Sequence, residues 1–347
     1  MKLLVVSGYV SWDKISKGLM PSHHLYGVHE MIDHYENNNG QIRGYFKKDI
    51  FIDGYIDFYL WNSGKKNIIK QTFELLKLSK QYDLVYDILN RCSIYLGFLK
   101  KFSLYKTKLV TVLHHPPYRL QLKNSNSDAY IFFDKIYLDW AIKECPKKKN
   151  IYFINKWGPD KDWYDKVAVG FTKKNLDVKY IDTGKSKRDR DLIISVANET
   201  GIRIDYAGDI DQKEGMARSY KVDLSDDIGM VYRILQYNTI IIPVQKCQKE
   251  LIGPLGVTSF LDCLALHKPI IVSDNVFFAK EVEDNNIGLV YKTGDQSSFK
   301  AALNKLSFEE GLYERIQNRI CNYTYPRIED YSKRLLEIIH LVYDRKE

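Results

Sequence analysis

Cysteine is scarce in this sequence and follows no metal-binding spacing. The five cysteines are Cys92, Cys145, Cys247, Cys263 and Cys321. They are odd in number and form no Cys-x-x-Cys pair, whereas zinc sites and disulfide frameworks need closely spaced or evenly paired cysteines. The sequence therefore predicts reduced thiols, without a zinc centre and without structural disulfides.

Long hydrophobic runs are also lacking. No segment approaches the roughly 18 apolar residues that cross a bilayer. The apolar stretch at the N-terminus is short, and no small-residue cleavage site follows it. We therefore expect a cytoplasmic protein. The chain has 347 residues, of which 45% are hydrophobic and 28% charged, so it has the composition of a folded protein and the length of two domains.

The excess positive charge is confined to the first half. Residues 1–160 contain 24 Lys and Arg against 15 Asp and Glu, whereas the remainder contains 28 against 29. Basic and aromatic residues alternate in GFLKKFSLYK at 97–106. This pattern is typical of a segment that lies on an anionic membrane surface, although a solvated helix face has the same composition. No nucleic-acid-binding motif accompanies the charge, so we expect no nucleic acid partner.

Short apolar strands alternate with amphipathic helices along the whole chain. The first half is predicted to have strands at 3–7, 41–46, 83–88 and 108–113, a helix after Ser22 and a helix over 65–80. The second half is predicted to have strands at 178–182, 202–206, 239–244, 269–272 and 288–291, with helices at 189–200, 227–236, 259–266, 297–306, 308–322 and 328–343. This alternation predicts an α/β fold with parallel sheets. We expect two Rossmann-like domains, 1–165 and 175–327, that face each other across a deep cleft. The segment NKWGPD at 155–160 and the polar stretch that follows it to about residue 177 are predicted to form the linker, or hinge, between the two halves.

One glycine-containing loop leads directly into a helix near residue 257. Gly253, Pro254 and Gly256 precede this helix, and glycine allows a ligand to approach the backbone closely. The free N–H groups of the first helical turn favour an anion such as a phosphate. Asp262 lies one turn further on, where its carboxylate could accept hydrogen bonds from the two hydroxyls of a ribose. An ordinary helix start with a surface aspartate is the alternative.

A second loop, at 182–189, carries several charges directly after a predicted strand. Lys185 and Arg188 could bind a diphosphate, since arginine offers a planar fork and lysine a point charge. A solvated basic turn in which Asp189 caps the next helix is the alternative.

Two histidine pairs follow strands of the first half. His114 and His115 end a buried strand, and because neighbouring strand residues point to opposite faces, only one of them is expected to face the cleft. His23 and His24 lie in the loop that follows the first strand, where they could contact a second substrate. Helix capping explains Ser22 in that loop equally well.

The segment from 256 to 271 resembles the nucleotide-sugar signature of GT-B glycosyltransferases, especially family 4, in which G-x-T-x-x-L-E-A-x-A-x-G-K-P-V-I is common. The matching residues are Gly256, Thr258, Leu261, Ala265, Lys268, Pro269 and Ile271. Asp262, Cys263 and His267 replace glutamate, alanine and glycine of that pattern, and Pro254 stands where the earlier glutamate of the family's E-x7-E motif is expected. The loop at 184–189 resembles the G-[GR]-x-x-R-D loop of related transferases.

The resemblance implies a hexosyltransferase that uses a nucleoside diphosphate sugar without a cofactor or a metal, and that retains the anomeric configuration. The donor would be bound by Gly184, Lys185, Arg188, Gly256, Thr258, Ser259 and Asp262. His114 or His115 would act at the donor sugar, and His23 or His24 at the acceptor. A C-terminal helix at 328–347 would pack on the first domain. The acceptor would be a glycan or a lipid-linked sugar of bacterial surface polysaccharide synthesis, at the inner face of the cell membrane.

Two other functions remain open at this point. A nucleotide-sugar epimerase has the same fold but needs proton-transferring groups at the sugar, and no convincing set of them is visible. A non-catalytic partner that binds a nucleotide sugar would also fit the substitutions at Pro254 and Asp262. A dinucleotide oxidoreductase is not expected, because Ser7-Gly8-Tyr9-Val10 after the first strand is not a G-x-G-x-x-G loop.

Overall fold

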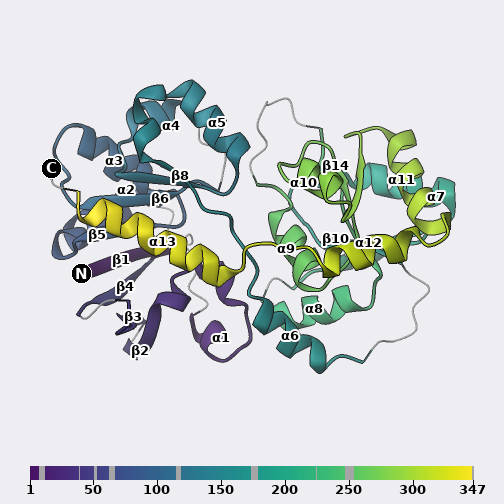
Figure 1. Ribbon diagram of the computed structural model, residues 1–347, viewed down its shortest axis with the longest axis horizontal. Helices are drawn as coiled ribbons and strands as arrows, with labels where there is room; N and C mark the ends of the chain where they lie inside the picture. The colour runs from purple at the N-terminus through teal and green to yellow at the C-terminus, as the bar shows by residue number, and fades with distance from the viewer. Residues whose placement is uncertain are drawn as a thin grey trace. The chain divides into compact units, whose positions relative to one another are not determined.

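A computed structural model divides the chain into two compact units (Figure 1). It describes residues 1–7, 12–38, 40–50, 53–61, 67–114, 119–172, 179–223, 225–246 and 254–345. Unit 1 comprises Met1–Lys17, Ser22–Gly158 and the chain from Pro326 on, and unit 2 comprises Gly18–Pro21 and Pro159–Tyr325. The sequence analysis placed the boundary near residue 165, whereas the chain passes from unit 1 to unit 2 at Gly158–Pro159.

The described part of unit 1 is built on a sheet in the order β2-β3-β4-β1-β5-β6-β7-β8. Its strands are β1 (Lys2–Ser7), β2 (Ile32–Asn38), β3 (Gln41–Phe46), β4 (Tyr55–Leu60), β5 (Leu84–Asp87), β6 (Lys108–Val112), β7 (Ala129–Phe132) and β8 (Tyr152–Ile154). Neighbours from β4 to β8 are parallel, and β2 and β3 add antiparallel pairs at one edge. The central strands are continuous apolar runs because both faces of a parallel sheet are covered.

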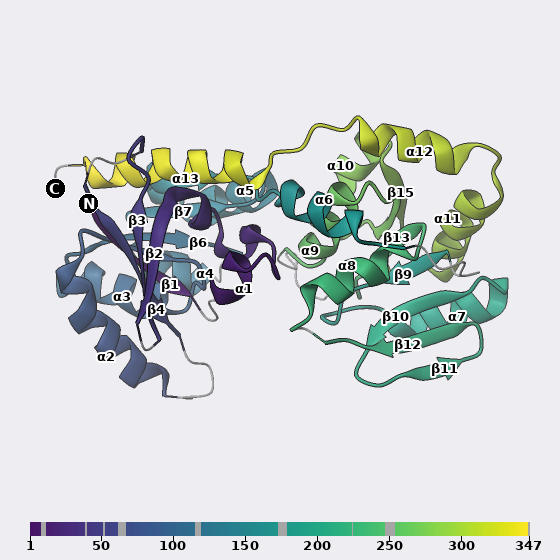
Figure 2. The same cartoon turned by 90° about the horizontal axis from the view of Figure 1, so that it is seen from below.

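Helices cover both faces of this sheet (Figure 2). Those of unit 1 are α1 (Trp12–Ser16), α2 (Ile68–Leu78), α3 (Cys92–Lys101), α4 (Arg119–Asn124), α5 (Lys135–Glu144) and α13 (Ile328–Tyr343). Val85 of β5 packs with Leu75 of α2 and Leu96 of α3. The next residue, Tyr86, points to the opposite face, where its hydroxyl lies 3.3 Å from that of Tyr331 in α13. No helix in the described ranges has both the length and the apolar composition to cross a bilayer.

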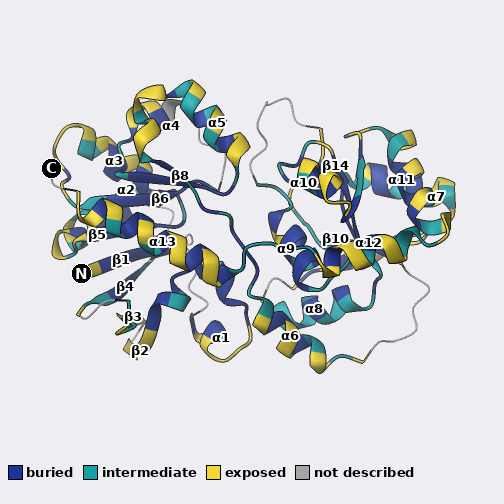
Figure 3. Ribbon diagram, in the orientation of Figure 1, coloured by how far each residue is buried: buried dark blue, intermediate teal, exposed yellow. Residues whose placement is uncertain are grey.

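The helix α13 belongs to unit 1 although it follows unit 2 in the sequence. Buried and exposed positions alternate along it, as expected for a helix with one face on a sheet (Figure 3). The Asn155 amide donates to the Tyr331 carbonyl at 2.9 Å, and the Ser332 hydroxyl donates to the Gly27 carbonyl at 2.8 Å. A side chain at Gly158 would lie 1.9 Å from the Pro326 carbonyl oxygen. The two chain segments that connect the units therefore leave unit 1 side by side.

The described part of unit 2 is built on a second sheet, in the order β11-β12-β10-β9-β13-β14-β15. Its strands are β9 (Tyr180–Asp182), β10 (Ile204–Gly208), β11 (Gln212–Glu214), β12 (Ala217–Lys221), β13 (Thr239–Ile242), β14 (Ile270–Ser273) and β15 (Gly288–Tyr291). All pairs are parallel except β11–β12. The chain starts at β9 in the middle, proceeds outward through β10 and β12, and then returns to β13 on the other side of β9. The strand order thus reverses between β9 and β13.

The helices of unit 2 contribute buried side chains to two separate hydrophobic clusters. These helices are α6 (Lys161–Val169), α7 (Arg190–Thr200), α8 (Asp227–Leu235), α9 (Val257–Ala265), α10 (Ala279–Asp284), α11 (Gln296–Phe308) and α12 (Leu312–Cys321). Ile193 of α7 and Phe299 of α11 are buried with Ile241 of β13 in the main core. Tyr164 of α6 packs with Val231 of α8 and Ala265 of α9 in a smaller cluster. The region that the sequence analysis treated as a polar linker therefore contains α6.

The prediction of a helix after Ser22 is wrong. The structure has only two short 3₁₀ turns there, Ser22–Leu25 and His29–Met31. Between them Tyr26 and Gly27 have φ values of 49° and 80°, in the left-handed region that ends a right-handed helix. A serine at the start of a segment is thus not sufficient evidence for a helix when the next turn contains a glycine.

Candidate functional site

The candidate site lies in unit 2, at the point where the strand order reverses. The loop after β9 and the segment after β13 run antiparallel here and bind each other through their backbones. The Asp189 N–H donates to the Pro243 carbonyl at 2.7 Å, and the Gln245 N–H donates to the Lys187 carbonyl at 2.9 Å. In open α/β sheets, ligands bind beyond the carboxyl ends of the strands at such a reversal.

Arg188 is the centre of this site. Its guanidinium is almost fully buried and donates from Nε to Asp182 Oδ1 at 2.9 Å. A second nitrogen lies 3.3 Å from the Ser259 hydroxyl at the start of α9. A Cβ at Gly184 would lie only 2.0 Å from the guanidinium, so the glycine leaves the space that Arg188 occupies. Burial raises the pKa of Asp182, and the positive charge of Arg188 opposes that rise.

The helix α9 begins beside Arg188 without a capping side chain. Its N-cap residue is Gly256, which has a φ of 82° and cannot supply a side-chain acceptor. In the first turn the Ser259 hydroxyl lies 2.7 Å from that of Thr183, so this serine links α9 to the loop after β9. Thr258 is exposed in the same turn. N–H groups of a first helical turn carry partial positive charge and attract an anion.

A cavity of about 290 Å³ opens next to Arg188. It is lined by Lys185, Lys187, Arg188, Arg190, Asp191 and Gln245. Four of these side chains are cations and one is a carboxylate. Lys185 also lies 3.4 Å from Asp209, which is largely exposed. Two carboxylates, Asp189 at the N-cap and Asp191 in the first turn, also lie at the start of α7, where helix N-termini favour negative charge.

Asp262 lies one turn further along α9 than Ser259, and it contacts α6. The Tyr164 hydroxyl donates to Asp262 Oδ1 at 2.6 Å. Burial raises the pKa of Asp262 to about 7, the Tyr164 hydrogen bond opposes this, and the negative charge of Asp227 adds to it. One carboxylate oxygen is thus bound to Tyr164, and the group changes charge near neutral pH.

The histidines predicted from the sequence lie in unit 1, and three of them share one aromatic cluster. His114 follows β6, and its ring lies 5.7 Å from Tyr26. Tyr26 stacks on Trp157 at 4.8 Å, and Trp157 meets the rings of His23 and His24 at 5.4 and 6.4 Å. His115 lies outside the described residues.

The charge of two of these histidines follows from their surroundings. Burial lowers the pKa of His23 well below its ordinary value, and the neighbouring His24 lowers it further. Burial lowers the pKa of His24 to about 4. Both rings are therefore neutral at pH 7 and can act there as hydrogen-bonding groups rather than as cations.

Two aspartates with the spacing of a metal motif have other partners. Asp209 pairs with Lys185, and Asp211 Oδ1 accepts from the Lys221 N–H at 3.0 Å. The residues that the structure describes contain no group of three or more His, Cys, Asp or Glu side chains arranged to hold a metal ion.

The sequence analysis missed several residues of the site. Asp182 and Thr183 were assigned no role. In the structure Asp182 accepts from Arg188, and the Thr183 hydroxyl contacts that of Ser259 in α9. Tyr164 was placed in the linker. Lys187 and Arg190 line the cavity beside the predicted Lys185 and Arg188. The signal for Asp182 was available, since a carboxylate that ends an apolar strand and precedes an arginine is a candidate ion pair.

One departure from the glycosyltransferase pattern, His267, and one matching residue, Lys268, have structural explanations. His267 has a φ of 52° directly after α9, in the left-handed position that a glycine commonly occupies at a helix end. Lys268 donates to the carbonyl of Tyr237 at 2.7 Å and so ties the end of α9 to the end of α8. The lysine of this motif therefore has a structural role in this chain.

No protein-family model and no curated protein sequence matches the chain. Solved structures match it over nearly its whole length. A glycosyltransferase from Rickettsia africae has a TM-score of 0.64 at 13% identity, with 99% of each chain covered. HepE from Anabaena in complex with UDP has a TM-score of 0.66 at 10% identity, covering 98% of this chain and 100% of that one. A UDP-N-acetylglucosamine 2-epimerase has a TM-score of 0.55 at 13% identity, covering 100% and 97%.

The chain has the GT-B fold. The expected α/β class with two Rossmann-like domains is thereby confirmed. At these low identities the similarity establishes the fold only, so membership of family 4 stays a prediction. The activity has to be argued from the side chains at the reversal of the second GT-B sheet.

Proposed function

We propose that the protein is a glycosyltransferase that binds a nucleoside diphosphate sugar in unit 2. One observation carries the proposal: four cationic side chains line a cavity at the strand-order reversal, beside a helix that starts without a capping side chain. The arrangement fits two linked phosphates, because the phosphate oxygens could accept from the lysines and arginines and from the N–H groups of α9. HepE binds UDP on the same fold, so uridine diphosphate is the first nucleotide to test.

Each group at the site has a proposed role in this chemistry. Arg188, held by Asp182 and Ser259, is positioned before the ligand arrives. Lys185, Lys187 and Arg190 would take up the negative charge that develops on the leaving diphosphate as the glycosidic bond breaks. Asp262 would accept hydrogen bonds from the ribose through the oxygen that Tyr164 does not occupy. The N–H groups of Thr258 and Ser259 would complete the phosphate cradle.

Unit 1 would supply the groups at the sugar and the acceptor. His114 is the described histidine that we propose at the donor sugar, and His23 and His24 would contact the acceptor as neutral groups. We propose transfer of a hexosyl group with retention, to a glycan or lipid-linked acceptor in polysaccharide synthesis, without a metal. These finer assignments rest on the resemblance of residues 256–271 to family 4 transferases.

Calorimetry of nucleotide binding tests the donor site. We expect UDP, GDP, CDP or dTDP to bind with or without Mg²⁺, and we expect the Lys187→Ala/Arg190→Ala double variant to bind it about 100-fold more weakly, since two charged hydrogen bonds are lost. Lys213→Ala, on the distant edge strand β11, is the matched control and should bind normally. Equal affinity in all three proteins would place the nucleotide elsewhere and contradict the proposal.

A product assay separates the transferase from its rivals. A transferase releases the nucleoside diphosphate only as sugar appears on an acceptor, and NMR of that product reports the anomeric configuration. An epimerase would change the sugar without an acceptor, which deserves a test because an epimerase shares the fold. A non-catalytic partner would bind the nucleotide sugar and leave it intact.

A further inference from the structure

The helices α2 and α3 of unit 1, with the turn after α3, expose seven large apolar side chains. They lie on α2, on α3 and in the turn after α3: Ile69, Phe73, Ile94, Tyr95, Phe98, Phe102 and Leu104. Phe73, Phe102 and Leu104 are 60%, 56% and 69% exposed, although these residue types are usually buried. We call this set the α2–α3 surface. Exposed apolar side chains gathered on neighbouring elements mark an interaction site more often than isolated ones do.

Helical spacing gathers these side chains into stripes. Ile69 and Phe73 are four residues apart on α2, as are Ile94 and Phe98 on α3, so each pair lies on one helix face. The rings of Phe98 and Phe102 meet edge to face at 5.0 Å. The two helices pack against each other through their buried sides, which contribute Leu75 and Leu96 to a common core. The exposed stripes therefore belong to one packed pair of helices.

The same stretch of chain is strongly basic. Residues 65–106 contain nine Lys and Arg against three Asp and Glu. The described basic residues that are exposed here are Lys70, Lys77, Lys80, Arg91, Lys101 and Lys106. One of the three acidic residues, Asp87, is fully buried and accepts from backbone N–H groups. The apolar stripes are therefore accompanied by positive charge.

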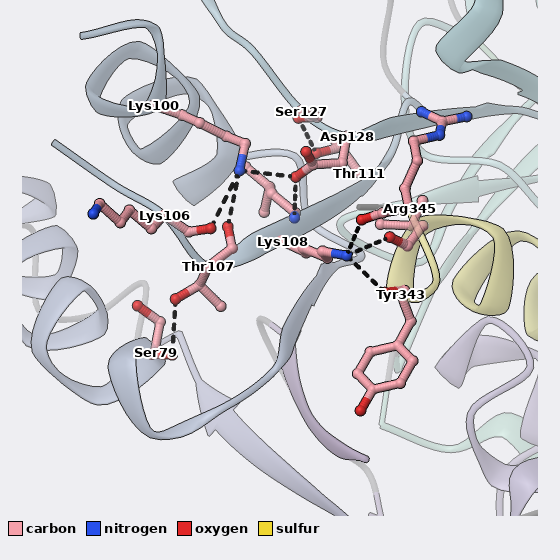
Figure 4. A network of polar contacts seen from close by, with 12 residues as sticks. Ser79, Lys100, Lys106, Thr107, Lys108, Thr111, Ser127, Asp128, Tyr343 and Arg345 are labelled. Carbon is pink, nitrogen blue, oxygen red and sulfur yellow. Dashed lines mark hydrogen bonds and ion pairs between the residues drawn. The ribbon is translucent and has the colours of Figure 1, made fainter. Parts of the chain in front are cut away.

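A polar network fixes the turn that carries Phe102 and Leu104 (Figure 4). Lys100 turns inward, where it pairs with Asp128 at 3.1 Å and donates to the Thr107 carbonyl at 3.3 Å. The Leu104 N–H donates to the Leu99 carbonyl at 3.0 Å. In the same view the Lys106 side chain points away from the network. The turn thus presents its two apolar side chains from a fixed backbone, and Lys100 is not part of the exposed charge.

We propose that the α2–α3 surface docks on a membrane that contains anionic lipids. Aromatic and branched apolar side chains would enter the boundary between headgroups and acyl chains, while the long lysine side chains reach the lipid phosphates. A surface with both features matches a bilayer, because apolar burial and charge attraction act on the same face and each reinforces the other. A protein partner would need an acidic apolar face, and a second copy would bring its own lysines against these.

This proposal does not depend on transferase activity, since flotation measures binding alone. The full chain is mixed with phosphatidylcholine vesicles that contain about one third phosphatidylglycerol, or with pure phosphatidylcholine vesicles. We expect the wild-type protein to float with the anionic vesicles, to float far less with the neutral ones, and to be released by high salt. Sedimentation of the wild type away from anionic vesicles would overturn the proposal.

Matched variants locate the binding surface. Phe98→Ser/Lys101→Gln removes one exposed aromatic and one exposed lysine, three residues apart on α3. Lys305→Gln/Phe308→Ser removes the same pair of types at the same spacing on α11 of unit 2, where both residues are exposed. We expect the α3 variant to bind anionic vesicles about tenfold or more weakly than wild type, and the α11 variant to bind normally. Equal binding by the two variants would contradict the proposal.

Two further measurements make the result decisive. If the α3 variant has a lowered melting temperature, Phe73→Ser/Lys77→Gln takes its place, because both of those side chains are exposed and lie on the other helix, α2. Analytical ultracentrifugation reports self-association. A wild-type dimer that the α3 variant loses, together with no vesicle binding, would assign the surface to a second copy and overturn the membrane proposal.

Discussion

Unit 2 contains two aspartate–arginine pairs in which the aspartate is fully buried and the surroundings differ. Asp205 and Arg218 face each other across the neighbouring strands β10 and β12, and the Tyr237 hydroxyl also donates to Asp205 at 2.6 Å. Asp182 and Arg188 lie at the end of β9 and in the loop after it. In the Asp205–Arg218 pair, a third side chain, Tyr237, also donates to the carboxylate. In the Asp182–Arg188 pair, the guanidinium also contacts Ser259 and lines a cavity.

The comparison shows that location decides what an ion pair can do. Asp205 is fully buried and accepts from both Arg218 and Tyr237, so this pair joins β10 and β12 to the segment after α8, and loss of one partner would leave a buried charge. The pair at the strand-order reversal lies where ligands bind in open α/β sheets, and Arg188 also lines a cavity there. The same two residue types therefore predict a structural role at Arg218 and a ligand-binding role at Arg188.

The largest expected effect is that of Arg188→Ala. It leaves the buried Asp182 without its partner, which costs about 3–5 kcal/mol in typical buried pairs, and it should abolish nucleotide binding. Thermal unfolding and calorimetry measure the two effects. The double variant Asp182→Asn/Arg188→Ala should regain part of the stability but none of the affinity. If Arg188→Ala unfolded and bound nucleotide as the wild type does, Arg188 would have neither the structural nor the ligand-binding role that distinguishes it from Arg218.

Arg218→Ala should separate stability from binding. Its side chain is 39% exposed, and Tyr237 still donates to Asp205 after the substitution, so we expect a smaller loss of about 1–3 kcal/mol. Nucleotide affinity should stay within about twofold of wild type, since sites without shared partners act independently. A large loss of affinity would show that both pairs belong to one site.

Asp262→Asn tests the carboxylate through its pH dependence. Because the pKa of Asp262 is raised to about 7 in the folded protein, the folded state holds a proton that the unfolded chain has lost between about pH 4 and pH 7. Stability from this group therefore falls as the pH rises through that range. The stability of Asp262→Asn relative to wild type should increase from about pH 5 to pH 8, as measured by melting temperature. A pH-independent difference would mean that the carboxyl group titrates normally.

The same variant should bind the nucleotide about tenfold more weakly near pH 8, because an amide replaces an ionised acceptor for the ribose. The wild type should lose affinity as the pH is lowered through about 7, whereas the variant should not. Matching pH profiles for the two proteins would exclude a ribose contact by Asp262.

Lys185→Ala is expected to have the smallest effect. The lysine is partly exposed and already paired with an exposed carboxylate, so solvent and salt screen its charge. Diphosphate affinity should fall about threefold to tenfold at low salt and less at high salt, with no change in melting temperature. Lys213→Ala on β11 is again the control. An effect as large as that of Arg188→Ala would show that Lys185 is buried by the ligand.

Sequence reasoning predicted several buried strands, among them β1, β5 and β6, but it missed the buried strands β4 and β7. Gly288–Tyr291 and the central strands of both sheets are short apolar runs between polar segments, and that signal is local. The edge strand β2 was missed because its sequence, IDHYENN, is polar and mostly exposed. Its strand structure depends on pairing with β3, which is not visible in its own composition. The helix α6 was missed because its charged residues resembled a linker.

The candidate site was predictable in its backbone features but not in its connections. Asp189 was recognised as a possible cap, and its carboxylate does accept from the Leu192 N–H at 3.2 Å. Gly256 was recognised as the start of a helix. The pairing of Arg188 with Asp182, and the contact of Ser259 with Thr183, join segments more than seventy residues apart in the second case. Such contacts follow from the order of strands in the sheet.

The return of α13 to unit 1 has a consequence for the order in which the chain folds during synthesis. Nearly all of unit 2 is contiguous in sequence, whereas unit 1 is interrupted between Gly158 and Pro326. The surface of unit 1 that receives α13, which includes Tyr86 and Gly27, emerges from the ribosome long before the helix itself. Unit 2 can therefore complete its core first, although domains usually fold from the N-terminus onward. During that interval the face of unit 1 that α13 covers in the folded protein is exposed, and exposed apolar surface of this kind favours aggregation of a partly folded chain.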